Sequence, residues 1–191
     1  MAETPPAPRR RDRAATRAAL LDAARIRFAA QGFDGTGLRE IAAQVGVDPA
    51  LIARYFGSKR QLYAEAMHVE IPVGVAADPH RPVVSIADAL LHDVVYQDWS
   101  AFGGEHPLLV MLRSAGHEAV RDQLRIQLCD GYLAEITDRL DGPDPALRAE
   151  LIGALLIGMG VLRSVIGAPA MSGAPIDRTR VLAARMVDAL T

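Results

Sequence analysis

Arg54, Tyr55 and Lys59 stand close together in the segment ALIARYFGSK, residues 50–59. An arginine guanidinium can form two hydrogen bonds with a guanine edge, and a tyrosine hydroxyl or a lysine ammonium can bind a phosphate. The segment contains no acidic residue that would repel a polyanion. These residue types at this spacing indicate contact with duplex DNA.

Two short helices joined by a tight turn would position these side chains. An apolar stripe predicts a helix over residues 37–45, and Gly46 is expected to end it. Pro49 is a typical first residue for a second helix, which would run to Phe56. Ile52 and Phe56 lie four residues apart and face inward, so the outer face carries Ala50, Leu51, Arg54 and Tyr55. This pattern is typical of a helix-turn-helix unit whose second helix enters the major groove.

Helices are also predicted on both sides of this unit. The first runs from about Ala15 to Gly32, where a glycine followed by Phe33 predicts a Schellman-type stop. Ser58 is expected to cap a further helix from Lys59 to about Glu70. The first amides of that helix, together with the lysine ammonium, would point at one phosphate.

The segment before the first helix, residues 1–14, is rich in proline and arginine and is predicted to be disordered. Its arginines are Arg9, Arg10, Arg11 and Arg13. Two interpretations stay open: the arm enters an adjacent minor groove, or it is a solvated tail. In the first case, removal of residues 1–13 would weaken DNA binding uniformly and flatten its salt dependence.

The composition is that of a globular protein whose charge is unevenly distributed. Residues 1–67 carry 11 Lys/Arg against 7 Asp/Glu, a net +4, and residues 68–191 carry 10 against 16, a net −6. A basic first third indicates a polyanionic partner for that end. Cys129 is the only cysteine, which excludes an internal disulfide and a four-cysteine zinc site and fits a reducing cytoplasm. We expect no membrane span and no secretory signal.

The rest of the chain is predicted to be helical, because no segment shows strand patterning with hairpin turns. Ser85 and Asp88 have the spacing of a capping box. Linkers or breaks are expected at residues 72–82, 101–107 and 168–175. The expected helices span residues 85–99, 107–116, 119–140, 146–167 and 177–190. The predicted fold class is therefore all-α, with about nine helices in total.

The segment from Ala19 to Met67 resembles the TetR family of bacterial transcriptional repressors. The matching residues are Phe28 with Gly32-Phe33, Arg39-Glu40-Ile41-Ala42, Gly46-Val47, Tyr55-Phe56-Gly57-Ser58-Lys59 and Leu62. The resemblance implies a helix-turn-helix DNA-binding domain at residues 15–60 and an effector-binding and dimerisation domain at residues 61–191. With the outer face described above, it implies DNA contacts by Thr36, Gly37, Ala50, Leu51, Arg54, Tyr55 and Lys59.

The second helix of the unit departs from the family pattern. The family often opens this helix with Ser-Lys-Gly, and it often has an aromatic residue and a histidine at the positions of Arg54 and Tyr55. Here the helix opens with Asp48-Pro49-Ala50. Asp48 is expected to cap the helix rather than to contact DNA, because a free carboxylate would repel phosphate. We expect Ala50, Leu51 and Arg54 to set the operator sequence.

The resemblance further implies a homodimer that binds a palindromic operator, and a small-molecule effector that releases it. Residues 146–167 are apolar on more than one face, which fits a helix covered both by its own core and by a partner. The expected dimer interface consists of Leu151, Leu155, Leu162, Val181, Leu182 and Met186. The expected effector pocket combines aromatic, sulfur and polar groups: His92, Tyr96, Trp99, Phe102, Met111, Met159 and Arg163.

Two other functions are weighed against this interpretation. A DNA-binding regulator without a small-molecule switch would use the same residues, and effector-dependent release in a gel-shift assay separates the two. An enzyme is disfavoured because the sequence has no phosphate-binding glycine motif, no Gly-x-Ser-x-Gly elbow and no cluster of metal ligands. The five histidines are scattered, so we expect neither a metal nor a cofactor. Repression or activation depends on where the operator lies, which the chain does not encode.

Overall fold

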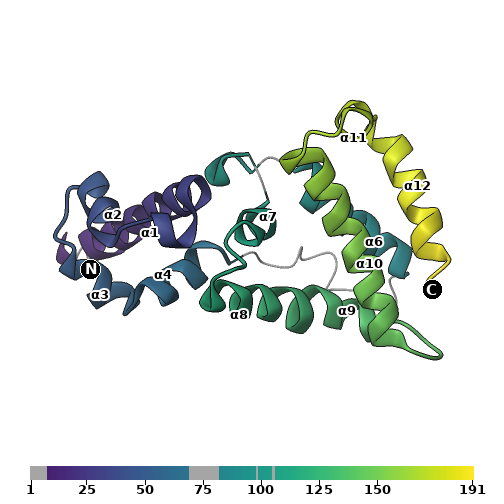
Figure 1. Cartoon of the computed structure of the whole chain (residues 1–191). Coiled ribbons are helices and arrows are strands. Elements are labelled where there is room, and N and C mark those ends of the chain that lie inside the picture. The colour runs from purple at the N-terminus through teal and green to yellow at the C-terminus, as the bar shows by residue number, and fades with distance from the viewer. Residues whose placement is uncertain (1–7, 69–81, 98, 105) are drawn as a thin grey trace, which may run out of the picture.

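The computed structural model describes residues 8–68, 82–97, 99–104 and 106–191. Every regular element within these ranges is helical, which confirms the all-α fold class. Helices α1 to α4 form one group at the N-terminal end, and the later helices form a second group beside it (Figure 1). α1 and α4 contact α7 and α8, so these four helices connect the two groups.

The N-terminal group consists of one long helix and three short ones: α1 (Pro8–Gly35), α2 (Leu38–Val45), α3 (Ala50–Phe56) and α4 (Lys59–Ala66). An aromatic core holds α1 against α4. The ring of Tyr63 packs edge-on against the rings of Phe28 and Phe33, with centroid distances of 4.9 and 5.0 Å. Each such pair contributes about 0.5–1.5 kcal/mol beyond the burial of its area.

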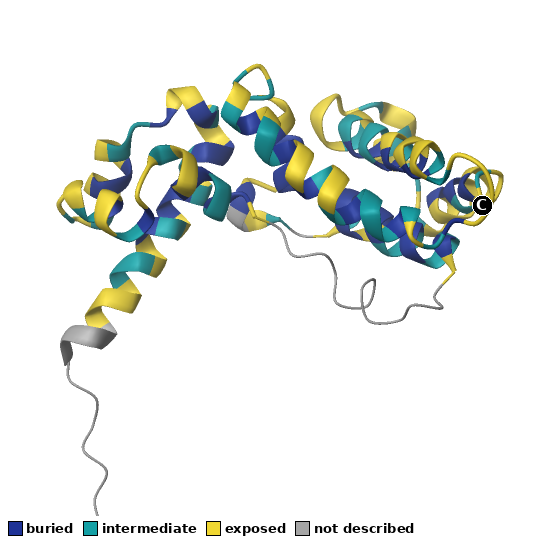
Figure 2. Ribbon diagram, turned by 90° about the horizontal axis from the view of Figure 1, so that it is seen from below, coloured by how far each residue is buried: buried dark blue, intermediate teal, exposed yellow. Residues whose placement is uncertain are grey.

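The observed course of α1 differs from its prediction at both ends. The helix already begins at Pro8, so the second half of the predicted disordered arm is helical. From residue 12, where the colouring of Figure 2 starts, the N-terminal part of α1 extends away from the other helices. Residues 1–7 lie outside the described residues. Gly32 has φ 71° and ψ −176°, a conformation essentially restricted to glycine. α1 therefore kinks at Gly32, and a last turn to Gly35 replaces the predicted Schellman-type stop.

The second group contains longer helices with π-helical continuations. Its elements are α6 (Val83–Leu91) with π-helical η1 (His92–Tyr96), the 3-10 turn η2 (Ser100–Phe102), α7 (Pro107–Leu112), α8 (Glu118–Gln127) with π-helical η3 (Leu128–Leu133) and α9 (Ala134–Thr137), α10 (Pro145–Gly160) with π-helical η4 (Val161–Val165), α11 (Pro169–Gly173) and α12 (Ile176–Asp188). α8, η3 and α9 form one continuous rod close to the predicted helix 119–140. The π-helical segments were not predicted, because apolar spacing cannot separate them from an α-helix.

Two local predictions in the second group are wrong. α6 begins after Pro82 without a side-chain cap, so Ser85 and Asp88 form no capping box. Asp88 instead accepts two hydrogen bonds from the guanidinium of Arg180 and thereby ties α6 to α12. The predicted loop at residues 168–175 contains the short helix α11. The predicted linker 72–82 lies outside the described residues except for Pro82.

Glycines allow α10 to pack closely against the rod and against η1. A Cβ atom on Gly153 would lie 2.6 Å from Cδ2 of Leu133, and one on Gly160 would lie 2.9 Å from Cγ1 of Val94. A larger residue at either position would force the neighbouring side chain to shift. α10 thus buries one face through Ala149, Ile152, Leu156 and Met159.

The helix formed by α10 and η4 is unusually apolar. By length and composition alone, the helix Pro145–Val165 could cross a membrane. An 18-residue stretch of it has a mean hydropathy of 1.6, and 33% of that stretch is buried inside the protein. The central helix of a soluble protein passes the same test, so this is weak support for a membrane span. Its uncovered side carries large apolar residues, among them Leu151, Leu162 and Val165, which are 47%, 42% and 43% exposed.

Candidate nucleic-acid interface

The α2–α3 corner has the geometry that the sequence predicted for the DNA-reading unit. Gly46 ends α2 in the left-handed region with φ 75° and ψ 33°. The carboxylate of Asp48 accepts a hydrogen bond of 2.7 Å from the backbone amide of Ala50, which supports its predicted capping role. Ile52 and Phe56 are buried at 0% and 6% exposure. These two anchors fix the rotation of α3 about its axis.

Fixing α3 in this way leaves one face of the helix in solvent. Ala50 and Arg54 are exposed, and Leu51 and Tyr55 are half-buried. Arg54 forms no ion pair with any described residue, so its guanidinium is available to a base or a phosphate. The four residues predicted to lie on the outer face are thus together on one surface. We refer to Ala50, Leu51, Arg54 and Tyr55 as the reading face.

The side chain of Thr36 is placed differently from the prediction. It is 1% exposed, and its single hydroxyl hydrogen is shared between the carbonyl oxygens of Gly32 and Arg27, which lie 2.8 and 3.2 Å from the hydroxyl oxygen. Those bonds satisfy carbonyl groups at the kink of α1. The hydroxyl of Thr36 is therefore bonded within the protein at the end of α1 and is not exposed to solvent. The adjacent Gly37 is half-buried and precedes α2 with an extended backbone.

The start of α4, which follows α3 in the chain, carries positive charge. The hydroxyl of Ser58 caps the helix by accepting a bond of 3.1 Å from the amide of Gln61. The ammonium of Lys59 lies 4.8 Å from the centroid of the Phe33 ring, a cation–π contact that orients it. Arg60 points away, because its guanidinium pairs with Asp122 of α8 at 3.0 Å.

The end of α1 docks on α7 and α8 through a junction that the sequence did not indicate. The hydroxyl of Ser114 accepts a bond of 3.2 Å from the amide of Phe33, and the guanidinium of Arg113 donates to the carbonyl of Ala29 at 2.9 Å. The imidazole of His117 lies 4.4 Å from the Phe33 ring. The Phe33 ring therefore contacts both Lys59 of α4 and His117 at the start of α8.

Two further contacts tie α4 along α8. One is the Arg60–Asp122 ion pair near the start of α4. The other lies just beyond its end, where the buried side-chain amide of Gln127 donates a bond of 3.0 Å to the carbonyl of Met67. α4 is therefore attached to α8 near both of its ends.

The seven predicted effector-pocket residues are not brought into one pocket. Trp99, Phe102 and His106 form one cluster, in which the Trp99 ring lies 5.8 Å from Phe102 and 4.8 Å from His106. Arg163 lies 4.5 Å from the ring of Tyr96 and also donates to the carbonyl of Met171. The other three are scattered: an exposed His92, a fully buried Met111 and a buried Met159.

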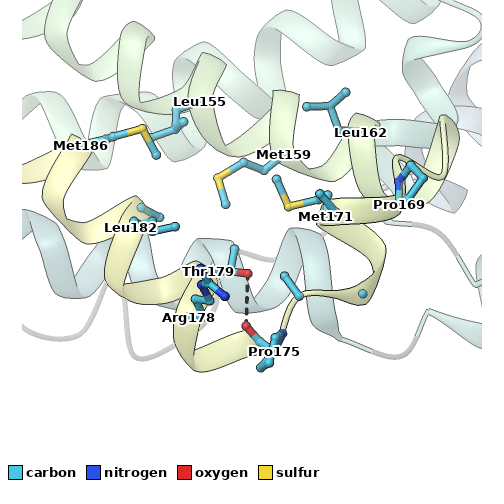
Figure 3. Close-up of a pocket in the computed structure, with 14 residues that line it drawn as sticks. Leu155, Met159, Leu162, Pro169, Met171, Pro175, Arg178, Thr179, Leu182 and Met186 are labelled. Atoms are coloured by element: carbon cyan, nitrogen blue, oxygen red, sulfur yellow. Dashed lines mark hydrogen bonds between the residues drawn. The ribbon is translucent and has the colours of Figure 1, made fainter.

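A large apolar groove lies between α10 and α12 and is closed at one end by α11 (Figure 3). Its volume is about 790 Å³. Figure 3 shows Leu155, Met159 and Leu162 on one wall and Leu182 and Met186 on the other. All of these residues except Met159 belong to the six that were predicted to form the dimer interface. The remaining two, Leu151 and Val181, are 47% and 53% exposed on the same helices.

A second, smaller hollow lies between α6, η3 and α10 inside the second group. It measures about 20 Å³, and apolar side chains line it together with Tyr132. The hydroxyl of Tyr132 is buried and has no hydrogen-bond partner among the described residues. Burial raises the pKa of Tyr132 well above its ordinary value, and the nearby charge of Asp93 raises it further.

Asp93 and His106 form a buried polar pair close to this hollow. The Nε2 atom of His106 lies 3.2 Å from Oδ2 of Asp93, and the two side chains are 0% and 7% exposed. Asp93, His106 and Tyr132 were not among the residues predicted from the sequence, because they lie far apart in the chain and give no local signal. Among the described residues, no group of three or more His, Cys, Asp or Glu could hold a metal ion.

Comparison with known proteins agrees with this arrangement. Residues 20–66 match the family described as bacterial regulatory proteins, tetR family, and residues 87–190 match the family described as tetracyclin repressor-like, C-terminal domain. A curated relative, the HTH-type transcriptional repressor SCO4008 of Streptomyces coelicolor, is 33% identical over 72 residues. That match spans 36% of this chain and 38% of the relative.

Solved structures share the fold over nearly the full length. The TetR-family regulator SCO0857 of Streptomyces coelicolor is similar with a TM-score of 0.58 and 25% identity, over 92% of this chain and 93% of that one. A TetR-family regulator of a Rhodococcus species has a TM-score of 0.65 at 20% identity, over 93% and 98% of the two chains. At that identity the second likeness concerns the fold alone.

Proposed function

The chain belongs to the TetR family of bacterial transcriptional regulators, and we propose that it is a cytoplasmic repressor that binds a palindromic operator as a homodimer until a small-molecule effector releases it. TetR-family regulators bind DNA and small-molecule effectors, usually as dimers, and are generally not enzymes. The reading face of α3 is the observation that carries the proposal. It is a partly exposed surface on which the guanidinium of Arg54 forms no ion pair with any described residue. Two buried anchors hold it, and a capped, cationic helix start follows it.

In the proposed complex, the reading face would contact bases and phosphates, and the start of α4 would contact a phosphate. Arg54 would read a base edge, and Ala50 would let the helix approach closely. Tyr55 and Lys59 would bind phosphates and so set the register on the duplex. The cation–π contact with Phe33 supports this role for Lys59, because it holds the ammonium at the start of α4.

The apolar groove between α10 and α12 supports a homodimer. Its walls and rim expose several large side chains, including Leu151, Leu162, Leu182 and Met186 at 47%, 42%, 52% and 46% exposure. Large apolar side chains that are exposed together on one side of a protein support an interaction site there. We assign the groove to a second copy of the chain, whose α10 and α12 would cover it. The two reading faces would then be related by two-fold symmetry and would match a palindrome.

Effector binding would act through a change in the population of two arrangements of α4. A shift of α8 would be passed on by Asp122 and Gln127, the two side chains that hold α4. The two reading faces of the dimer would then lose the spacing of the half-sites. To turn a 1:99 ratio of the arrangements into 99:1, the effector must prefer one by about 5.5 kcal/mol.

Two measurements test the proposal. In a gel-shift assay, the purified protein should retain DNA from its own promoter region and should prefer it over random DNA of equal length. In sedimentation equilibrium, the protein should have the mass of a dimer at micromolar concentration. A failure to bind promoter DNA at low ionic strength, or a monomeric mass, contradicts the proposal. DNA binding that no metabolite extract of the host weakens would favour a regulator without a small-molecule switch.

A further inference from the structure

His117 caps α8 and lies at the junction between the two groups of helices. Its Nδ1 atom accepts a bond of 3.2 Å from the backbone amide of Ala119, so the imidazole serves as the N-terminal cap of the helix. Its ring lies 4.4 Å from the ring of Phe33, and its Nε2 atom lies 3.6 Å from Oδ1 of Asp34. One side chain of the second group therefore contacts two consecutive residues near the end of α1.

The cap of α8 requires an uncharged imidazole. A nitrogen that accepts a hydrogen bond carries no proton, so the proton of a neutral His117 resides on Nε2, the atom that faces Asp34. In the protonated imidazole both nitrogens are donors, and the hydrogen on Nδ1 would meet the hydrogen of the Ala119 amide. Histidine is the side chain that ordinarily changes its charge between about pH 5 and pH 8. Binding of a proton by His117 therefore breaks the cap.

A second helix begins with the same arrangement, but its histidine is closed to solvent. Nδ1 of His106 accepts a bond of 3.1 Å from the amide of Leu108 at the start of α7, and its Nε2 atom lies 3.2 Å from Oδ2 of Asp93. The side chain of His106 is 0% exposed, whereas that of His117 is 36% exposed. Water reaches His117 and can deliver a proton without any opening of the structure. Of these two capping histidines, His117 is the one that can respond to the pH of the solvent.

The charges around His117 do not compensate for the loss of the cap. Asp34 of α1 would attract an imidazolium, but its side chain is 80% exposed, and ion pairs in solvent contribute little. Two positive charges oppose the imidazolium. One is the ammonium of Lys59 of α4, which lies 4.8 Å from the centroid of the same Phe33 ring, and the other is the positive end of the α8 helix dipole.

The other ionisable side chains of the packed elements are engaged or lie in solvent. The guanidinium groups of Arg113, at the end of α7, and of Arg121, in α8, donate to the carbonyl oxygens of Ala29 and Ala115. Burial raises the pKa of Tyr63 of α4 well above its ordinary value, so this ring stays uncharged. Glu118 in the first turn of α8 is exposed. The uncharged imidazole is therefore the form that fits this junction.

We propose that His117 makes the attachment of the DNA-reading unit sensitive to pH, so that mild acidification loosens the attachment and weakens operator binding. The inference rests on the proposed function, which supplies the operator. On binding a proton, the imidazole turns away from the amide of Ala119 and from the ring of Phe33. The Phe33 ring then loses a packing partner on the side of α8, and the contact that orients Lys59 at the start of α4 weakens with it.

Operator affinity at pH 8 and at about pH 5.5 tests the proposal. Fluorescence anisotropy with DNA from the protein's own promoter region, at constant ionic strength, should show that the wild type loses about fivefold in affinity at the lower pH, the effect expected when a helix cap is lost. His117→Asn should bind as wild type at pH 8 and should keep its affinity at the lower pH, because asparagine caps a helix without changing charge.

His92→Asn is the matched control for this variant. His92 is an exposed histidine of η1 in the second group, so its replacement should leave the pH dependence of the wild type unchanged. An equal loss of affinity on acidification in the wild type and in His117→Asn would overturn the inference. So would a loss that disappears in His92→Asn but persists in His117→Asn.

Nuclear magnetic resonance of the DNA-free wild type tests the same junction without a variant and without an operator. The ring of His117 and the backbone amides of Ala119 and Phe33 should titrate with one common midpoint. The amide of Leu108, which the buried His106 caps, should keep its chemical shift over the same range. An Ala119 amide that does not follow the titration of His117 would show that the cap survives protonation, and the inference would be wrong. A failure to bind promoter DNA at pH 8 contradicts the proposed function instead, and the Ala119 titration distinguishes the two failures.

Discussion

Arg54 is the side chain of the reading face with the greatest capacity to distinguish bases. Its position four residues after Ala50, on the side of α3 opposite Ile52 and Phe56, directs it away from the protein. No described acidic residue pairs with it, so no ion pair has to break before it binds DNA. We therefore expect Arg54 to contribute to the choice of operator.

Arg54→Ala should lose about 1–3 kcal/mol of binding free energy on the cognate operator and should relax the preference at one base position. Fluorescence anisotropy with the operator, with single-base variants of it and with random DNA measures both effects. Arg125→Ala, an exposed arginine of α8, is the matched control and should bind as wild type. An equal loss on random DNA would assign Arg54 to a phosphate instead.

Thr36 is expected to act on stability rather than on DNA affinity. Thr36→Val keeps the shape of the side chain but removes the hydroxyl whose hydrogen is shared between the carbonyl oxygens of Gly32 and Arg27. The loss of a buried hydrogen-bond donor should lower the free energy of unfolding by about 1 kcal/mol. Urea denaturation measures this change. If operator affinity falls instead while the free energy of unfolding stays unchanged, the hydroxyl of Thr36 contacts DNA and its role is not structural.

At the scale of the elements, the kink of α1 decides how the two groups of helices meet. It brings the amide of Phe33 to Ser114 and places the ring of Phe33 between Lys59 and His117. α4 is fixed along α8 by its own two contacts. The DNA-reading unit is thus attached to the second group of helices at the kink of α1 and along α4.

Gly32→Ala should disturb this attachment. The backbone of Gly32 has φ 71°, and an added Cβ would lie 2.7 Å from the hydroxyl oxygen of Ser114. Strain of this kind costs about 1–3 kcal/mol, so the melting temperature should fall and operator affinity should fall with it. Gly116→Ala is the control, because no atom lies within 4 Å of its added Cβ. A Gly32→Ala protein as stable as the control would show that the kink is not constrained.

At the scale of the whole molecule, the proposed function requires two copies of the chain to associate. The groove between α10 and α12 leaves large apolar side chains in solvent, while the opposite face of α10 is covered by η1 and η3. Burial of apolar area stabilises association by about 25 cal/mol per Å² before the costs of association are subtracted. The same association would place two reading faces on one duplex.

Leu182→Glu should convert the protein to monomers, because it places a charge in the middle of the proposed interface. Sedimentation equilibrium should then give the mass of a single chain, and affinity for a palindromic operator should fall toward that for a half-site. Ile126→Glu is the matched control, since Ile126 is 49% exposed on α8, away from the groove. A dimer that survives Leu182→Glu but not Ile126→Glu would move the interface to α8.

The sequence by itself determined the elements whose signals are local. Gly46, Pro49 and Ser58 mark helix ends within a few residues, and the spacing of Ile52 and Phe56 determines which face of α3 is free. The family resemblance depends on residues of the same short segment. For this reason the all-α fold, the α2–α3 corner and the reading face could be predicted from the amino-acid sequence.

Only the tertiary structure decided the features that depend on distant residues. In the structure Thr36 is buried, and the seven predicted pocket residues do not line one pocket. Tyr132 lies near Asp93 and His106, which are distant from it in the sequence. Helical periodicity shows that a residue faces inward but not which distant residue it will meet, because that depends on how whole helices cross and pack. The features that depend on such crossings could not be predicted from the sequence, whereas the proposed DNA-reading face follows from one short stretch of chain.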